Sequence, residues 1–95
     1  MPAFFIVQAT IKNEPQFQKY REVVIPFIAK CGGKIVARGA GVEVLEGERD
    51  KRPVLMVEFP DMDAVRAFWN SPGFVPIKKM REGAATVDAW AFPGV

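Results

Sequence analysis

The sequence predicts an α+β fold in which strands and helices follow one another in the order βαββαβ. Four segments are rich in β-branched and aromatic residues, and their side chains either alternate between apolar and polar or are apolar throughout, as is typical of strands. Two further segments repeat apolar residues at helical spacing, and Asn, Asp, Pro and Gly stand at the segment ends, where they favour caps and turns. The chain has 95 residues, so we expect a single domain over residues 1–95.

The first strand is expected over Phe4–Ile11, where side chains alternate between two faces. Asn13 then caps a helix that runs to about Cys31, because its side chain can accept the free backbone amides of the first turn. Pro26 lies deep in this helix and removes a backbone hydrogen bond at a cost of about 3 kcal/mol. It predicts a kink or break near Val23–Pro26, and two glycines end the helix.

The rest of the chain predicts two strands, a helix and a last strand. A strand is expected over Lys34–Arg38, with a bulge at Gly39 and Gly41 and a continuation over Val42–Glu46. After a turn over Gly47–Arg52 we expect a strand over Pro53–Phe59 and a helix over Met62–Asn70 capped by Asp61. A short helix completed by Lys78–Glu82 and a strand over Ala84–Phe92 end the chain. This order is the ferredoxin-like pattern with an antiparallel sheet.

Helices cover only one face of such a sheet, yet the other face is also expected to be apolar. Its apolar residues are Phe4, Ile6, Val36, Val54, Met56, Trp90 and Phe92. A large exposed apolar face marks an interaction site, and a second copy of the same sheet is the simplest partner. The sequence therefore predicts a homodimer.

Composition excludes several classes of function. The net charge is only +2, and the basic cluster of Lys78, Lys79 and Arg81 is followed at once by Glu82, so we interpret it as a solvated helix face and expect no nucleic acid partner. With Cys31 as the lone cysteine and no histidine, the usual zinc and redox motifs are absent, and we predict no cofactor and no metal. No basic leader or membrane-length apolar run is found, so we expect a cytoplasmic protein that does not enter the membrane.

Short motifs spread along the whole chain resemble those of a known family. They are Tyr20, Gly32-Gly33, Arg38-Gly39, Leu45-Glu46-Gly47, Phe59-Pro60, Ala67 with Trp69, Ser71-Pro72, and Arg81 before Ala84-Ala85. In this order and spacing they resemble the DUF1330 family of the dimeric α/β barrel superfamily. The resemblance implies a homodimer whose two sheets face each other, and it implies no established activity.

Two positions depart from that family pattern. Ala40 stands where the family usually has a second glycine after Arg-Gly, and Gly73-Phe74 stands where it usually has a tyrosine after Ser-Pro. Phe74 keeps the ring and loses the hydroxyl. If that hydroxyl binds a ligand in relatives, this chain binds something less polar or nothing comparable.

Strand alternation predicts a set of polar side chains on the dimer-facing side of the sheet. With Trp90 they are Gln8, Thr10, Arg38, Glu58 and Asp88. Polar groups there are costly unless they have partners. Two interpretations stay open: Arg38 anchors an anion in a small cavity with Glu58 as its partner or as general base, or the two form a cross-strand ion pair that fixes the dimer register.

Other residues have open roles as well. Glu46 lies near a turn, and three roles stay open for it: an exposed surface residue, a partner of Arg49, or a contact with a partner subunit. For Arg81 two roles stay open: an ion pair with a carboxylate of the chain, or binding of an anionic ligand. Tyr20 and Trp69 have the spacing of core residues. The ligand-binding candidates are therefore Arg38, Glu46, Glu58, Trp69, Arg81 and Trp90, and the catalytic candidates are Glu58 and Arg38.

Two functions are compatible with this sequence. The first is a binding module that holds a small, partly apolar ligand between sheet and helices. The second is a cofactor-independent enzyme of isomerase, lyase or monooxygenase type, acting on a small organic acid or aromatic compound, by analogy with other dimeric α/β barrels. Without histidine, proton transfer near neutral pH would require a carboxylate, lysine or tyrosine with a shifted pKa.

Overall fold

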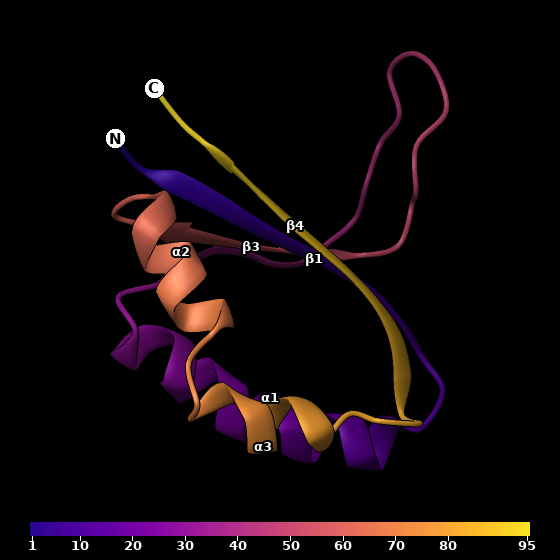
Figure 1. Ribbon diagram of the computed structural model, residues 1–95. Coiled ribbons are helices and arrows are strands. Elements are labelled where there is room, and N and C mark those ends of the chain that lie inside the picture. Colours follow the sequence, from indigo (N-terminus) through magenta and orange to yellow (C-terminus); the bar gives the residue numbers. More distant parts are fainter.

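The structure, a computed structural model, describes all of residues 1–95 and contains four strands and three helices (Figure 1). In chain order they are β1 (Ala3–Ile11), α1 (Glu14–Lys30), β2 (Lys34–Ala40), β3 (Val54–Phe59), α2 (Met62–Trp69), α3 (Phe74–Lys79) and β4 (Ala85–Pro93). The predicted order βαββαβ and the ferredoxin-like arrangement are confirmed, with α3 as the short extra helix, which ends at Lys79 rather than Glu82.

The four strands form one antiparallel sheet in the order β2-β3-β1-β4. The central strand β1 pairs on both edges, so that Phe5 lies opposite Val57 of β3 and Ala91 of β4. The two chain ends lie side by side (Figure 1), and the Gly94 N–H donates a 2.7 Å hydrogen bond to the carbonyl of Pro2. All three helices cover one face of the sheet and leave the other face open (Figure 1).

The long helix α1 begins as predicted but has no break. The side chain of Asn13 accepts a 3.1 Å hydrogen bond from the Gln16 N–H, which caps the first turn. The helix continues through Pro26, which is exposed, so of the expected kink or break near Val23–Pro26 the break is wrong. Val24 and Ile28 lie buried on either side of the proline, and packing of this face against the core holds the helix together.

The core between sheet and helices is built mainly from aromatic rings. Phe68 of α2 lies at its centre, with its ring centroid 4.8 Å from that of Phe74, 5.5 Å from that of Phe59 and 5.6 Å from that of Phe5. Tilted and edge-on rings at such distances attract one another beyond the burial of their surface. This cluster holds α2 and α3 against one end of the sheet.

Residues 41–53 form a long loop rather than the expected strand over Val42–Glu46, and that prediction is wrong. Ala40 pairs with Val54, the first residue of β3, so the chain beyond Ala40 finds no partner strand. The loop rises from the open side of the sheet, away from the helices (Figure 1). Gly41, expected in a bulge, lies in this loop.

Two irregularities shift the register between β2 and β3. Ile35 lies opposite Val57 and Ala37 lies opposite Met56, so Val36 is an extra residue without a partner. The second irregularity falls between Arg38 and Ala40, as the sequence predicts. The first was not predicted, and because one extra residue moves every later side chain to the other face, it decides where the following side chains point.

Candidate functional site

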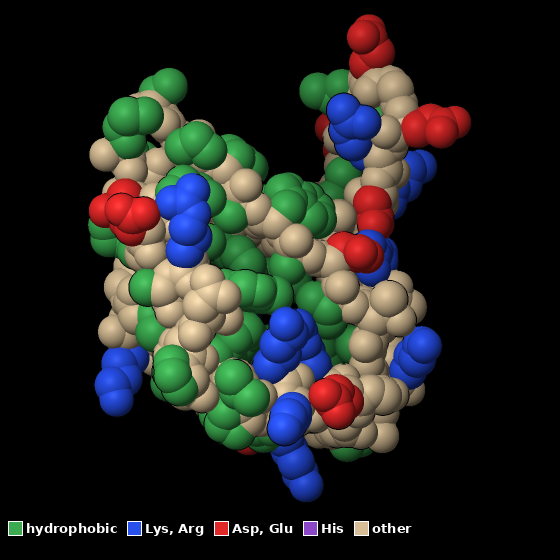
Figure 2. All heavy atoms as spheres, viewed as in Figure 1, with side chains coloured by type: hydrophobic (Ala, Val, Ile, Leu, Met, Phe, Trp, Pro, Cys, Tyr) green, Lys and Arg blue, Asp and Glu red, His purple; other side chains and the backbone are tan.

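A cavity of about 620 Å³ lies between the helix-covered face of the sheet and α1. Its floor is formed by sheet residues that alternate toward the helices, among them Phe5, Val7, Ala9 and Ile11 of β1. Of the 20 residues that line it, 14 are hydrophobic, so the walls suit an apolar body. Figure 2 shows hydrophobic side chains around a hollow near the middle of the molecule as seen in this view, with Lys or Arg side chains beside it.

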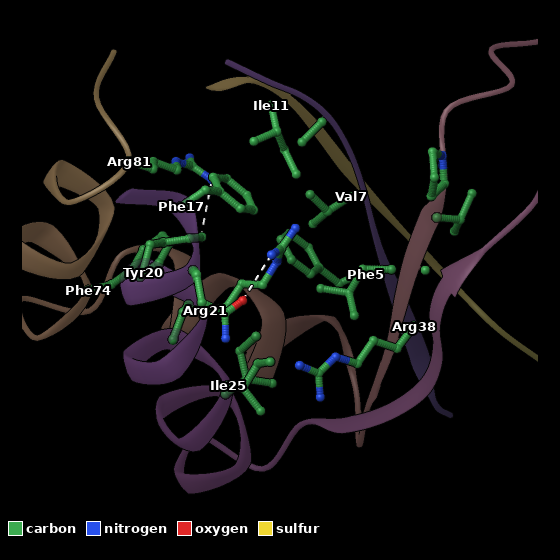
Figure 3. A pocket seen from close by; sticks show the side chains of 18 of the residues that line it. Phe5, Val7, Ile11, Phe17, Tyr20, Arg21, Ile25, Arg38, Phe74 and Arg81 are labelled. Carbon is green, nitrogen blue, oxygen red and sulfur yellow. Dashed lines mark hydrogen bonds between the residues drawn. The ribbon is translucent and has the colours of Figure 1, made fainter. Parts of the chain in front are cut away.

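Three arginines from three different segments line the cavity, and no acidic residue does. Arg21 comes from α1, Arg38 comes from β2, and Arg81 comes from the turn after α3. Figure 3 shows Arg38 extending from β2 toward α1, where Arg21 and Ile25 lie. The polar groups of the cavity are therefore mainly positive.

Only one of these three charges is neutralised by a carboxylate. Arg21 forms a 2.6 Å ion pair with Glu14, donates to the side chain of Gln18 and lies 4.8 Å from the centre of the Phe17 ring. Neither Arg38 nor Arg81 forms an ion pair. The cavity thus has two uncompensated guanidinium groups.

Arg81 contacts Tyr20 at the cavity wall. Its guanidinium donates a 3.3 Å hydrogen bond to the Tyr20 hydroxyl oxygen (dashed in Figure 3) and lies 5.5 Å from the ring centre. Burial raises the pKa of the Tyr20 hydroxyl above its usual value, and the positive charge and hydrogen bond of Arg81 partly offset this shift. The hydroxyl is therefore protonated at neutral pH, and its own proton has no acceptor within the chain.

The predicted pairing of Arg38 with Glu58 is wrong. Because of the extra residue Val36, Arg38 lies opposite Leu55 and on the helix-covered face, while Glu58 lies opposite Lys34 and Phe4 on the open face. The two candidates for catalysis therefore lie on opposite sides of the sheet. Neither the shared cavity nor the ion pair that fixes the dimer register is possible for them within this chain.

The remaining candidates divide between the two faces and the loop. Trp69 lines the main cavity together with Arg38 and Arg81. Trp90 lies on the open face, 45% exposed, and shares only a smaller hollow of about 210 Å³ with Trp69. Glu46 is exposed on the loop and makes no pair with Arg49, whose side chain donates to the Glu48 carbonyl instead.

The open face has its own polar cluster, centred on Arg52 of the loop. Arg52 forms ion pairs with Asp50 and, at 2.6 Å, with Asp88 of β4, and it donates to the Thr10 hydroxyl. The side-chain amide of Gln8, only 5% exposed, donates to the carbonyls of Asp50 and Arg52. These contacts join the base of the loop to the sheet, so the polar residues predicted here serve structure.

Sequence reasoning missed two of the residues that matter. Arg21 follows Phe17 by one helical turn, so its place beside the apolar stripe of α1 was available from the spacing. Arg52 was assigned to a turn, and nothing in its local sequence indicates that it reaches Asp88, 36 residues away. Arg81, a ligand-binding candidate within a basic run expected to be a solvated helix face, lies half-buried at the cavity.

Fold and cavity together define a small α+β protein of ferredoxin-like fold with a basic, largely apolar cavity under its helices. The chain belongs to the DUF1330 family, described as a domain of unknown function, whose sequence profile matches residues 2–95. A comparison with curated proteins finds no match. No helix combines the length and the apolar composition that crossing a membrane requires.

Solved structures share this fold over almost the whole chain. A protein of unknown function from Rhodopseudomonas palustris is 18% identical, with 99% of this chain and 82% of that chain covered and a TM-score of 0.75. SnoaB, a cofactor-independent oxygenase from Streptomyces nogalater, is 22% identical, with 99% and 93% covered and a TM-score of 0.71. A dimeric ferredoxin-like protein of unknown function from Bacteroides fragilis is 16% identical, with 98% and 96% covered and a TM-score of 0.64. At these identities the likeness establishes the fold alone.

Proposed function

We propose that this protein binds a small, largely apolar organic ligand in the cavity between the sheet and α1. The observation that carries this proposal is the cavity itself. Its volume of about 620 Å³ lies within the roughly 300–1,000 Å³ typical of sites for small molecules. Its walls are mainly hydrophobic and aromatic, with a few polar groups from separate segments, which is the usual construction of such a site.

The sheet residues under α1 favour an occupant. Val7, Ala9 and Ile11 point toward the helices, yet they are only partly buried, unlike Ala3 and Phe5 at the other end of the same strand. Leaving apolar surface in contact with water costs about 25 cal/mol per Å². A ligand with an apolar body would cover this surface.

A matched pair of variants on α1 tests the cavity. Ile25 is half-buried and lines it, whereas Val23 is exposed and does not. Nile red is an uncharged apolar dye whose fluorescence increases in an apolar site. Ile25→Trp fills part of the cavity and should abolish this increase, whereas Val23→Trp should leave the increase unchanged. Circular dichroism verifies that both variants are folded. No dye binding by the wild type, or equal binding by both variants, would reject the proposal.

We further propose that two copies associate through their open sheet faces. Trp90 and Phe92 are 45% and 43% exposed on this face, and Leu45 of the loop on the same side is 89% exposed. The accessible surface of 6157 Å² exceeds the roughly 5,500 Å² expected of a folded monomer of this mass. One structural relative, from Bacteroides fragilis, is described as dimeric.

Light scattering on the purified protein measures the assembly. Trp90→Glu places a charge on the open face, within the proposed interface, and should yield monomers. Val75→Glu, at a 53% exposed position of α3 on the helical side, should leave the dimer intact. A monomeric wild type would overturn this part of the proposal.

A second candidate is a cofactor-independent enzyme that transfers a proton within the same cavity. The protonated Tyr20 hydroxyl beside Arg81 favours it, because this pair can stabilise an enolate oxygen by hydrogen bonding. No carboxylate lines the cavity, so hydroxide or a buffer base from solvent takes the proton from the carbon. The SnoaB likeness is compatible with chemistry that needs no cofactor. The wild-type protein should accelerate deuterium exchange at the methylene of phenylpyruvate, and Tyr20→Phe should not. If exchange with the wild-type protein is no faster than in buffer alone, this candidate is excluded.

A further inference from the structure

We infer that the ligand is an organic carboxylate, whose acid group is held by Arg81 and Tyr20 while its apolar body lies across the aromatic wall of the cavity. This inference rests on the proposed ligand-binding function and adds its chemical class. The two anchoring groups come from the turn after α3 and from α1, which meet at the wall of the cavity (Figure 3).

The charge of the cavity favours an anion. Arg21 is neutralised by Glu14, but Arg38 and Arg81 have no carboxylate partner, and no Asp or Glu lines the cavity. Arg81 is half-buried, so its guanidinium loses hydration that an anionic ligand would replace, whereas Arg38 is exposed and keeps its water. A cation would be repelled, and a neutral apolar compound would leave the half-buried Arg81 without an anionic partner.

Arg81 and Tyr20 present the donors that a carboxylate needs. The guanidinium fork of Arg81 uses one N–H on the Tyr20 oxygen and has others free, while the Tyr20 hydroxyl hydrogen has no acceptor within the chain. Tyr20 is only 8% exposed, so its ring is fixed and its hydroxyl is confined to the cavity wall. One carboxylate can accept from both groups at once.

The apolar walls argue for a carboxylate on an apolar body rather than for inorganic phosphate or a sugar phosphate. Phe5, Trp69 and Phe74 form a continuous aromatic surface, with ring centroids 5.9 Å apart between Phe5 and Trp69 and 5.4 Å apart between Trp69 and Phe74. Gly39 is the only glycine in the lining, so the cavity has no Gly-rich loop of the kind that binds a phosphate through its backbone amides. An aromatic ring or short alkyl chain fits this wall.

The test compares naphthoate with its uncharged amide, naphthamide, by isothermal titration calorimetry on the wild-type protein. The two probes have the same apolar body, so their difference isolates the charge. We expect naphthoate to bind about tenfold or more tightly, the size of one charge-assisted hydrogen bond. Inorganic phosphate at equal ionic strength should not displace it, and added salt should narrow the difference.

Variants then locate the acid group. Arg81→Gln should weaken naphthoate binding about tenfold and naphthamide binding much less, because only naphthoate is charged. Tyr20→Phe should weaken naphthoate binding severalfold. Arg49→Gln is the control, because it removes the same charge from an exposed position of the loop. Its naphthoate affinity should equal that of the wild type.

The outcomes separate this inference from the function on which it rests. If naphthamide binds as tightly as naphthoate, or Arg81→Gln has no effect, the carboxylate assignment is wrong and the apolar cavity function remains. If neither probe binds and Nile red does not bind either, the ligand-binding function itself fails. Tighter binding of naphthoate that depends on Arg81 and Tyr20 supports both.

Discussion

Arg38 lies directly opposite Leu55 in the β2–β3 ladder, and this pairing puts its guanidinium on the helix-covered face of the sheet. Simple alternation from Lys34 would place it on the open face, opposite Val54 and on the same side of the sheet as Glu58. The single extra residue Val36 makes the difference, and it moves a positive charge from the open face into the cavity. The chemistry of the candidate site thus depends on a β-bulge.

Gly39 allows the second irregularity of this strand. Its φ of +68° lies in the left-handed region, which costs other residues about 1–2 kcal/mol, although nothing lies within 4 Å of an added Cβ. Gly39→Ala should therefore lower the free energy of unfolding by about 1–2 kcal/mol, measured by urea denaturation. Gly41→Ala is the control, because Gly41 has equal space and no positive φ. Equal stability of the two variants would contradict the backbone argument.

Most of the fold could be predicted from local patterns. Alternation over β1 and β4, the apolar stripe of α1 and the caps Asn13 and Asp61 are all local signals, and the structure confirms them, with both cap side chains accepting backbone amides. The resemblance to DUF1330 is confirmed as well. These features follow from spacing within one element, which the sequence displays directly.

The parts that failed depend on pairing between distant segments. The bulge at Val36 exists only relative to β3, and the end of β2 is set by where β3 begins. Arg81 belongs to a basic run that looks like a solvated face, and only the packing of α3 against α1 brings it to Tyr20. The composition of the cavity therefore depends on strand register and helix packing, which local sequence patterns do not display.

Gln8 should control the order of the loop at residues 41–53. Its buried amide donates to the carbonyls of Asp50 and Arg52 at 3.2 and 2.9 Å, so Gln8→Leu leaves two loop carbonyls without their donor. We expect a loss of about 1–2 kcal/mol of stability and faster tryptic cleavage after Arg49 and Lys51. Limited proteolysis followed by mass spectrometry measures the cleavage rate.

The control for this loop experiment is Thr86→Val, an exposed position on the same open face. It removes a polar group without touching the loop contacts and should be cleaved at the wild-type rate. If Gln8→Leu is cleaved no faster than Thr86→Val, the amide does not hold the loop.

Phe68 should be among the most costly residues to truncate. It is 1% exposed and contacts the rings of Phe5, Phe27, Phe59 and Phe74. Phe68→Ala should destabilise the protein by about 3–5 kcal/mol, because it removes this burial and leaves a void in the centre of the aromatic cluster. Thermal denaturation measures the loss. Val75→Ala, at an exposed position of α3, should change stability by less than about 0.5 kcal/mol; comparable losses in the two variants would show that the rings are loosely packed.

Tyr20 is the only tyrosine in the chain, so tyrosinate absorbance reports on this residue alone. Burial raises the pKa of its hydroxyl above the usual 10.0, and Arg81 lowers it in part. Since the pKa is higher in the folded protein, the stability that Tyr20 contributes is fully present below pH 10.0 and is lost as the pH rises through the folded value.

Alkaline titration of the folded protein should therefore give a midpoint above that of free tyrosine, and Arg81→Gln should move the midpoint further upward, because the favourable positive charge is gone. Arg66→Gln removes an exposed charge on α2 that does not act on Tyr20, and it should leave the midpoint in place. Tyr20→Phe should remove this part of the decline in stability at high pH, measured by urea denaturation across the alkaline range. A midpoint at the free value, or one that Arg81→Gln lowers, would show that the hydroxyl is neither buried nor in contact with the guanidinium, and the carboxylate anchor would lose its basis.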